Sequence, residues 1–365
     1  MAVAVSSCLL YFWPLNQPSP FMARPVLVLK FGTASITRPT GELHEPALVD
    51  IARQVAALRD RYNVVLVSSG AVGAGRAAIG DYRGEISQRK AAAAVGNLLL
   101  LNVYGRFFGV YGVTIAQSLC ERHHFANRDQ FLQLKDTYEE LWANGIIPIV
   151  NENDVVSNRE LKFSDNDELA TLLAVGFGAE VLMLCTSVGG LLDPDGHLIR
   201  YVPRLTEAVF AVVRTDKSSL GLGGMASKLT FAKLATRMGI RVVIFGLQEP
   251  DSIRKALDGE VGTQLEPQPI TMSARSRWLG SGSLVVGRVR IDAGAVAALQ
   301  RRSSLLAVGV CDILGEFSAG EVFEIVDEAD VAVAVARAKL SSFDLSTLTN
   351  RQNVAVANAS DIVLL

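Results

Sequence analysis

NENDVVSNRELKFSDND, residues 151–167, places two clusters of carboxylate and carboxamide side chains around a short basic and apolar segment. It follows the apolar run IIPIV at 146–150, which predicts a buried strand. In parallel α/β sheets, ligands bind beyond the carboxyl ends of the strands, where the first cluster falls. Carboxylates there can hold an ammonium group and amide N–H groups a carboxylate, but Asn, Asp and Ser are also ordinary turn formers. The neighbouring elements therefore decide between a ligand site and a plain loop.

Strands and helices alternate on both sides of this stretch. VLVLK at 26–30 predicts a strand covered on both faces, ending in Lys30, although a lone lysine there is more often solvated. VVLV at 64–67 predicts a second strand, which leads into the glycine-rich turn SSGAVGAG at 68–75. The repeated order predicts an α/β fold with three αβα layers, in which helices cover both faces of a mostly parallel sheet. The other expected strands lie at 113–116, 181–185 and 241–245, and the expected helices at 46–61, 91–108, 131–142, 168–175 and 228–238.

A second glycine-rich loop, SSLGLGGMASK at 218–228, precedes an expected helix that carries Lys228 in its first turn. Backbone N–H groups at a helix N-terminus and a nearby ammonium group suit a polyphosphate. The simpler alternative is a flexible loop with an exposed lysine. Neither this loop nor the turn at 68–75 has the glycine spacing of a Walker loop or of the dinucleotide fingerprint.

Composition divides the chain of 365 residues into two domains. We expect an α/β domain at 25–258, a turn-rich linker at 259–274 and, at 275–365, a small β-barrel-like domain whose only expected helix is 293–300. Residues 1–24 are expected to be an N-terminal extension, disordered or a start-site artefact, because a second methionine stands at Met22. They lack the basic start and cleavage site of a secretory signal.

Charge and cysteine usage exclude several classes of protein. The net charge of −2 gives no general attraction to nucleic acid or to an anionic membrane. The four cysteines are scattered without metal-ligand spacing, which favours a reducing cytoplasm. His123 and His124 have no acidic or cysteine partner at ligand spacing, so we interpret them as capping or solvated side chains.

Several motifs together, VLVLKFGTAS, VSSGAVGAG, NENDVV, FSDND and GLGGMASK, resemble in order and spacing the glutamate 5-kinases of the amino acid kinase superfamily. SLLAVGV and GEFSAGEVFEI, nearer the C-terminus, are similar to the PUA-type barrel that many of these enzymes carry. The resemblance extends over 25–365. It implies an ATP-dependent kinase that converts L-glutamate to L-glutamyl 5-phosphate, the first step of proline biosynthesis, with Mg²⁺ bound to ATP. It also implies proline as a possible feedback inhibitor. A homo-oligomer is expected, with the apolar helix at 91–101 as a candidate contact, although the oligomeric state is left open.

The resemblance also implies a role for each matching residue. Lys30 and Lys228 would contact the transferring phosphoryl group, and Asp167 between them would hold both ammonium groups. Residues 155–164 are expected to form a mobile cover over the substrate, and no protein ligand to the metal is expected. The expected glutamate-binding residues are Ser69, Asn151, Asp154, Asp165 and Asn166. The expected ATP-binding residues are Lys30, Thr186, Ser187, Leu222, Gly223, Gly224, Met225, Ala226, Ser227 and Lys228.

Two positions differ from the commoner family pattern, and both lie on the nucleotide side. Ser187 stands where many members have Asp, and Leu222 where they have Thr, which leaves the nucleotide preference open. Two alternatives to a glutamate kinase also remain. N-acetylglutamate kinases share the fold, although their substrate lacks the ammonium group that would compensate a buried Asp154. PUA-type domains elsewhere contact RNA, although this one has balanced charges.

Overall fold

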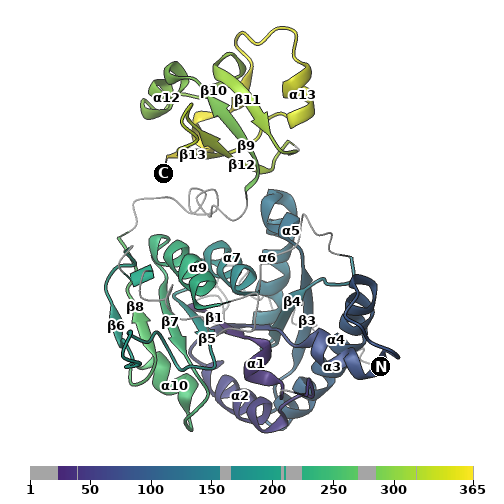
Figure 1. The fold of residues 1–365 in the computed structure, drawn as a ribbon. Coiled ribbons are helices and arrows are strands. Elements are labelled where there is room, and N and C mark those ends of the chain that lie inside the picture. The colour runs from purple at the N-terminus through teal and green to yellow at the C-terminus, as the bar shows by residue number, and fades with distance from the viewer. Residues whose placement is uncertain are drawn as a thin grey trace, which may run out of the picture.

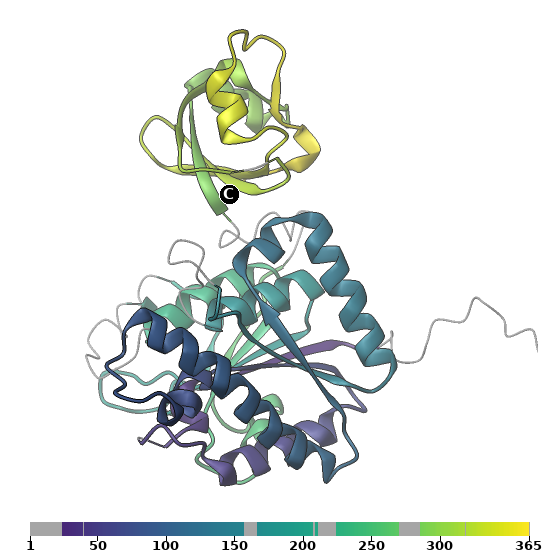
Figure 2. The same cartoon turned by 90° about the vertical axis from the view of Figure 1, so that its right-hand side faces the viewer.

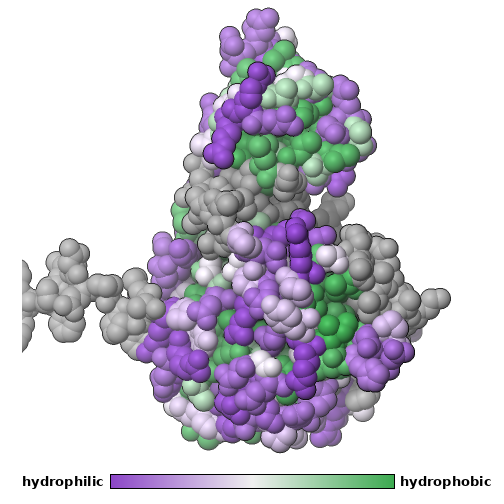
Figure 3. Space-filling view, turned by 90° about the vertical axis from the view of Figure 1, so that its left-hand side faces the viewer, coloured by the Kyte–Doolittle hydropathy of each residue, from purple (hydrophilic) through white to green (hydrophobic). Residues whose placement is uncertain are grey.

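The structure is a computed structural model that describes residues 24–38, 40–156, 166–206, 209–210, 224–269, 285–317 and 319–364. The chain forms a larger α/β unit and a smaller β-rich unit (Figures 1 and 2). Figure 3 shows one face of the molecule, on which the larger unit presents mainly hydrophilic residues with small hydrophobic patches between them.

An eight-stranded sheet with the order β3-β4-β2-β1-β5-β7-β8-β6 forms the centre of the larger unit. Its neighbouring strands are parallel except β7 and β8, which are antiparallel. The mostly parallel sheet expected from the βα order is thus confirmed. The strands are β1 (Val26–Phe31), β2 (Asn63–Ser68), β3 (Ile115–Cys120), β4 (Ile147–Glu152), β5 (Val181–Cys185), β6 (Tyr201–Val202), β7 (Arg241–Phe245) and β8 (Thr263–Leu265).

Helices cover both faces of this sheet, because successive strand side chains point to opposite sides. Leu27 and Leu29 of β1 belong to one buried cluster, together with residues of α2 (Glu45–Leu58), α4 (Ile86–Gly109) and α10 (Ser252–Leu257). Val28 belongs to a second cluster, on the other face. That face is covered by α6 (Arg128–Ala143), α7 (Asn166–Phe177) and α9 (Met225–Arg237). The larger unit also has three short helices, α1 (Thr33–Ile36), α3 (Ala71–Gly75) and α5 (Arg122–Ala126).

The smaller unit combines a five-stranded sheet, β11-β9-β12-β13-β15, with the strand pair β10-β14. Its separate core includes the stacked rings of Phe317 and Phe323, whose centroids lie 4.9 Å apart. The strands are β9 (Val285–Ile291), β10 (Leu305–Leu306), β11 (Val310–Leu314), β12 (Val322–Val326), β13 (Ala332–Arg337), β14 (Ala355–Ala357) and β15 (Ile362–Leu364), and the helices are α12 (Ala293–Gln300) and α13 (Ser342–Thr347).

Two expectations about the C-terminal half were wrong. Strand β8 lies inside the expected linker 259–274 and pairs with β7, so this part of the chain completes the first sheet. Turn-rich composition predicts breaks in the chain but does not reveal a strand of only three residues. Helix 293–300 is also not the only helix of the smaller unit, since α13 begins after Ser341, whose side chain accepts a hydrogen bond from the Asp344 amide.

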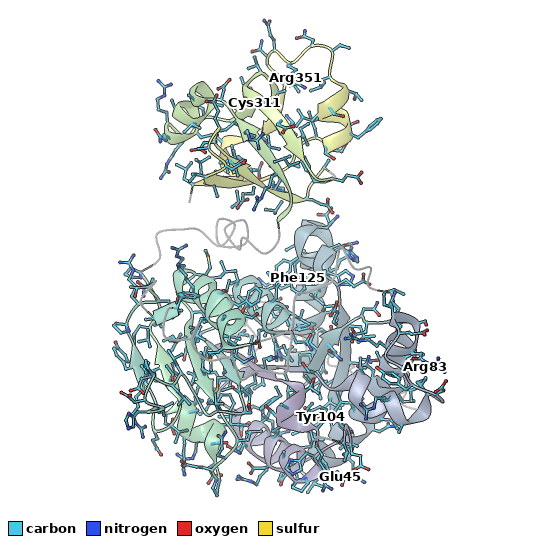
Figure 4. All side chains as sticks on the ribbon, in the orientation of Figure 1. Glu45, Arg83, Tyr104, Phe125, Cys311 and Arg351 are labelled. Atoms are coloured by element: carbon cyan, nitrogen blue, oxygen red, sulfur yellow. The ribbon has the colours of Figure 1, made fainter. Side chains whose placement is uncertain are left out.

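Helix α4 meets α3 through two glycines that bring their backbones into contact. A Cβ atom on Gly96 would lie 1.7 Å from the Ala71 carbonyl oxygen, and one on Gly75 would lie 1.9 Å from the Ala92 carbonyl oxygen. By length and composition α4 could also cross a membrane. Its Tyr104 and Phe108 side chains, however, are buried in the same hydrophobic cluster as Leu27 and Leu29 of β1. Tyr104 is labelled in Figure 4.

We expect Gly96→Ala to destabilise the protein by about 3 kcal/mol, because the opposing atoms are backbone and cannot rotate away. Gly105→Ala is the matched control on the same helix, since its Cβ would meet only Ile115 Cδ1, at 3.8 Å. The control should stabilise the helix by about 0.5–1 kcal/mol. Urea unfolding of both variants measures the difference, and equal midpoints would contradict the close α3–α4 packing.

Candidate active site

Functional side chains converge at the carboxyl edge of the sheet because β1, β2, β4 and β5 are parallel. Lys30 lies near the end of β1, paired in register with Val67 of β2 and Leu184 of β5. Asn151 lies near the end of β4, and Ser69 follows β2 directly, its amide donating to the Phe31 carbonyl at 3.0 Å. This is the edge at which parallel α/β sheets bind ligands.

Strand alternation decides which helices Lys30 meets. Lys30 is two residues from Val28, so both side chains point to the face covered by α7 and α9. Asp167 stands in the first turn of α7, where a carboxylate also interacts favourably with the helix dipole. Lys228 is the fourth residue of α9. The three side chains therefore meet above the end of β1.

Asp167 bridges the two lysines. Its Oδ1 lies 2.6 Å from Lys30 Nζ and its Oδ2 lies 2.7 Å from Lys228 Nζ. The exposed fractions of Lys30, Asp167 and Lys228 are 5%, 0% and 7%. Two ammonium groups so close would repel strongly in a buried site, and the carboxylate compensates that repulsion. The three groups together carry one formal positive charge, which suits an anion.

A second cluster beside these residues is built from amides. Asn166, the first residue of α7, donates from Nδ2 to Ser69 Oγ at 2.9 Å and to Asn151 Oδ1 at 3.0 Å. Asn151 Nδ2 donates in turn to Asn97 Oδ1 of α4 at 2.9 Å. Asp154 lies in the turn that follows β4 and is half-buried. Four separate elements thus meet in one polar cluster adjacent to Asp167.

The N-terminus of α9 and the end of β5 border the other side of the lysines. The α9 N-cap is Gly224, which makes no side-chain cap hydrogen bond, and a helix N-terminus of this kind is a common binding place for a phosphate. Met225, Ala226 and Ser227 occupy this first turn together with Lys228. Thr186 follows β5, where its amide donates to the Phe245 carbonyl at 2.7 Å, and the Ser187 carbonyl accepts from Gln248 Nε2 at 2.6 Å.

Asp165, Leu222, Gly223 and most of the expected cover at 155–164 lie outside the described residues. Asn97 was missed by the sequence analysis, and so was Tyr104, whose hydroxyl lies 3.1 Å from Ser68 Oγ. Asn97 did leave a signal, since it is a single carboxamide inside the apolar run AAAAVGNLLLL.

Cys185 lies near this site but is not a nucleophile. Burial raises the pKa of its thiol to about 11, so the thiol remains protonated at neutral pH. Its Sγ donates to Ser35 Oγ at 3.4 Å.

Two other polar groups in the described part of the chain have roles of their own. His124 accepts from the Glu121 amide at 3.0 Å and completes the capping box of α5, which confirms its interpretation as a capping side chain. Asp193, Asp195 and His197 could hold a metal ion by distance, but they form an exposed turn in which Asp193 Oδ1 accepts from the amides of the other two.

A cavity of about 370 Å³ lies away from the lysines. Arg24, Arg59, Tyr62, Trp142 and Asn144 are among its lining residues. They stand at the amino ends of β1, β2 and β4, which is the edge opposite to Lys30. This cavity therefore does not belong to the candidate active site.

The fold and the site define an α/β protein with two buried lysines, bridged by one carboxylate, at the carboxyl edge of its mostly parallel sheet. Residues 25–246 match the family model described as the amino acid kinase family, and residues 287–359 match the PUA domain model. The chain belongs to the amino acid kinase family, in the group whose curated members are named glutamate 5-kinase.

Relatives from two bacteria illustrate this similarity. A glutamate 5-kinase of Synechococcus elongatus is 40% identical, with the alignment covering 90% of this chain and 92% of the relative. A glutamate 5-kinase of Vibrio campbellii is 37% identical, covering 93% and 92%. Among solved structures, a Giardia lamblia carbamate kinase bound to AMP-PNP shares the fold, with a TM-score of 0.50, 18% identity, and coverage of 67% of this chain and 99% of that one.

Proposed function

We propose that the protein transfers the γ-phosphoryl group of ATP to the side-chain carboxylate of L-glutamate, as the first step of proline biosynthesis. The observation that carries this proposal is the bridge of Asp167 between Lys30 and Lys228, beside the amide cluster of Asn166 and Asn151. The similarity to glutamate 5-kinases over nearly the whole chain supports glutamate as the acceptor.

The chemistry requires charge stabilisation rather than a general base. The glutamate side-chain carboxylate is already ionised at neutral pH, so an oxygen can attack the γ-phosphorus directly while the bond to ADP breaks. The difficulty is bringing two anions together and stabilising the charge on the transferring group. Lys30 and Lys228 supply that stabilisation from two sides, and Asp167 holds both in place before the substrates arrive.

ATP binds, in this proposal, along the first turn of α9, with Thr186 and Ser187 on the nucleotide side. Asp167 has a lysine on each carboxylate oxygen, so it is poorly suited to be a metal ligand. A Mg²⁺ ion would therefore be held by the phosphate oxygens of ATP and by water molecules rather than by this carboxylate. The ion would neutralise phosphate charge.

The amino-acid head of glutamate is assigned to Ser69, Asn151, Asp154 and Asn166. Carboxamide and carboxylate oxygens suit its ammonium group, whereas N-acetylglutamate has a neutral amide there. Trapping of the acyl phosphate with hydroxylamine, using ATP, Mg²⁺ and each acid in turn, tests this. Preferential turnover of N-acetylglutamate would overturn the proposal, and the same panel with added proline tests feedback inhibition.

We expect Asp154→Ala to raise the KM for glutamate by about tenfold or more while changing kcat little, because the proposal assigns this carboxylate to the substrate ammonium group and not to the phosphoryl group. Asp195→Ala, which removes an exposed carboxylate from the turn after β5, is the control and should change neither constant. Steady-state kinetics with varied glutamate measure the effect. Unaltered glutamate affinity in the Asp154 variant would contradict the assignment.

Other features of the proposal concern assembly and location. Helix α4 exposes Val95, Leu98 and Leu99, and we propose this surface as a contact in a homo-oligomer. A cytoplasmic location is consistent with Cys120, Cys185 and Cys311, which are free thiols. RNA binding by the smaller unit is not favoured, because Arg288 and Arg290 form ion pairs with carboxylates of the same unit.

A further inference from the structure

Asn97 is a buried carboxamide on α4 for which the phosphoryl-transfer mechanism provides no role. It is 7% exposed and lies among apolar residues of the helix. Among the described residues, its side chain makes one hydrogen bond, in which Oδ1 accepts from Asn151 Nδ2 at 2.9 Å. A buried carboxamide costs free energy unless its hydrogen bonds are made, so a single bond to a substrate-side residue calls for an explanation.

The direction of that hydrogen bond is fixed by the backbone. Asn151 Oδ1 accepts from the Glu152 amide at 2.9 Å. A backbone N–H can only donate, so the oxygen of the Asn151 carboxamide must face it. The Asn151 nitrogen must then point to Asn97, whose oxygen accepts. Rotating the Asn151 carboxamide by 180° would set two donors against each other at Glu152 and two acceptors against each other at Asn97.

Asn166 continues the same chain of hydrogen bonds. Its Nδ2 donates to Asn151 Oδ1 and to Ser69 Oγ, at 3.0 and 2.9 Å, which uses both amide hydrogens. Its Oδ1 is buried and has no hydrogen-bond partner within the described part of the chain. The series from Asn97 through Asn151 to Asn166 therefore ends in an acceptor that a ligand donor can satisfy.

The packing of α4 holds Asn97 at the required distance. Its neighbour Gly96 lies against the Ala71 carbonyl without room for a Cβ atom. Tyr104, two helical turns further on, reaches Ser68 Oγ at 3.1 Å from the same face of the helix. Ser68 directly precedes Ser69, so α4 is anchored to the cluster at both positions.

We propose that Asn97 is a positioning residue for the amino-acid substrate. By accepting from Asn151, it holds the nitrogen side of a carboxamide whose oxygen side is held by the Glu152 amide, and it thereby supports the position of the Asn166 carboxamide, whose oxygen then receives the substrate ammonium group. The inference rests on the proposed function, because it assumes that Asn166 contacts the amino-acid head. Asn97 would thus affect the affinity for the amino-acid substrate from α4, whereas Lys30, Asp167 and Lys228 lie on other elements.

Two variants of Asn97 test the inference. Asn97→Leu keeps the approximate shape but removes the acceptor, and the KM for glutamate should rise about tenfold while kcat and the KM for ATP stay within about twofold. Asn97→Asp keeps an oxygen at the same place and should return the KM to within about threefold of the unchanged protein. Asn102→Leu, an exposed position on the same helix, is the matched control and should change nothing.

A structural role alone would give a different pattern. An unchanged glutamate KM in Asn97→Leu would overturn the inference, and so would a parallel loss of kcat, ATP affinity and thermal midpoint that Asn97→Asp fails to reverse. Failure of the unchanged protein to use glutamate at all would instead overturn the proposed function. The two failures are therefore distinguishable in one set of assays.

Discussion

Asp167→Asn should lower kcat by about a thousandfold, because the neutral amide holds one ammonium group through its oxygen and turns its NH₂ group toward the other. The side chains of Lys30 and Lys228 are only 6% and 9% exposed, so water cannot replace the lost charge. The KM for ATP should stay the same or fall, since the site gains net positive charge. A lower kcat with an unchanged or lower KM for ATP would show that the lysines have lost their positions while the site still binds phosphate.

The same substitution should also destabilise the protein. Removing one partner of a buried ion pair leaves the other charge uncompensated, which costs about 3–5 kcal/mol. Urea unfolding without ligands measures this loss, and ATP should recover part of it by supplying anionic oxygens. Asp129→Asn is the control. Both carboxylates stand in the first turn of a helix, but Asp129 of α6 is exposed whereas Asp167 of α7 is buried. Equal kcat values for Asp167→Asn and the unchanged protein would contradict the assigned role.

Lys228→Ala should abolish most phosphoryl transfer while leaving glutamate binding nearly unchanged. Its Nζ lies on the side of Asp167 that faces α9, so its loss removes one of two cations at the phosphoryl position. We expect kcat to fall by about a thousandfold, the effect of deleting one preorganised donor at a developing charge. The KM for glutamate should stay within about threefold, because the amide cluster does not contain this lysine.

Lys233→Ala is the matched control for this prediction. Lys233 lies on the same helix, but its ammonium group lies over the Phe210 ring, 5.3 Å from the centroid, and not against Asp167. It should retain nearly full kcat. Single-turnover measurements with saturating ATP and glutamate separate the chemical step from binding. A kcat within tenfold of the unchanged protein in Lys228→Ala would show that Lys30 suffices alone.

Local pattern in the sequence determined most of the fold. Apolar runs of four to six residues alternate with helical periodicity from β1 to β7, and such runs form a parallel sheet covered on both faces regardless of the details of packing. The strand β8 and the helix α13 were missed, because elements so short carry too few residues to show a period. The motif order also identified the family.

The family resemblance implied that Asp167 stands between Lys30 and Lys228, but the physical reason that these side chains meet lies in the tertiary structure. Nothing in the spacing of Lys30, Asp167 and Lys228 puts one carboxylate between two ammonium groups. That geometry arises because strand alternation turns Lys30 toward α7 and α9. Asn97 likewise reads as an interruption of an apolar helix until the Gly96 and Gly75 contacts bring α4 close enough for it to reach Asn151. Sequence patterns record local preference, whereas a site depends on long-range packing that sets distances to a fraction of an ångström.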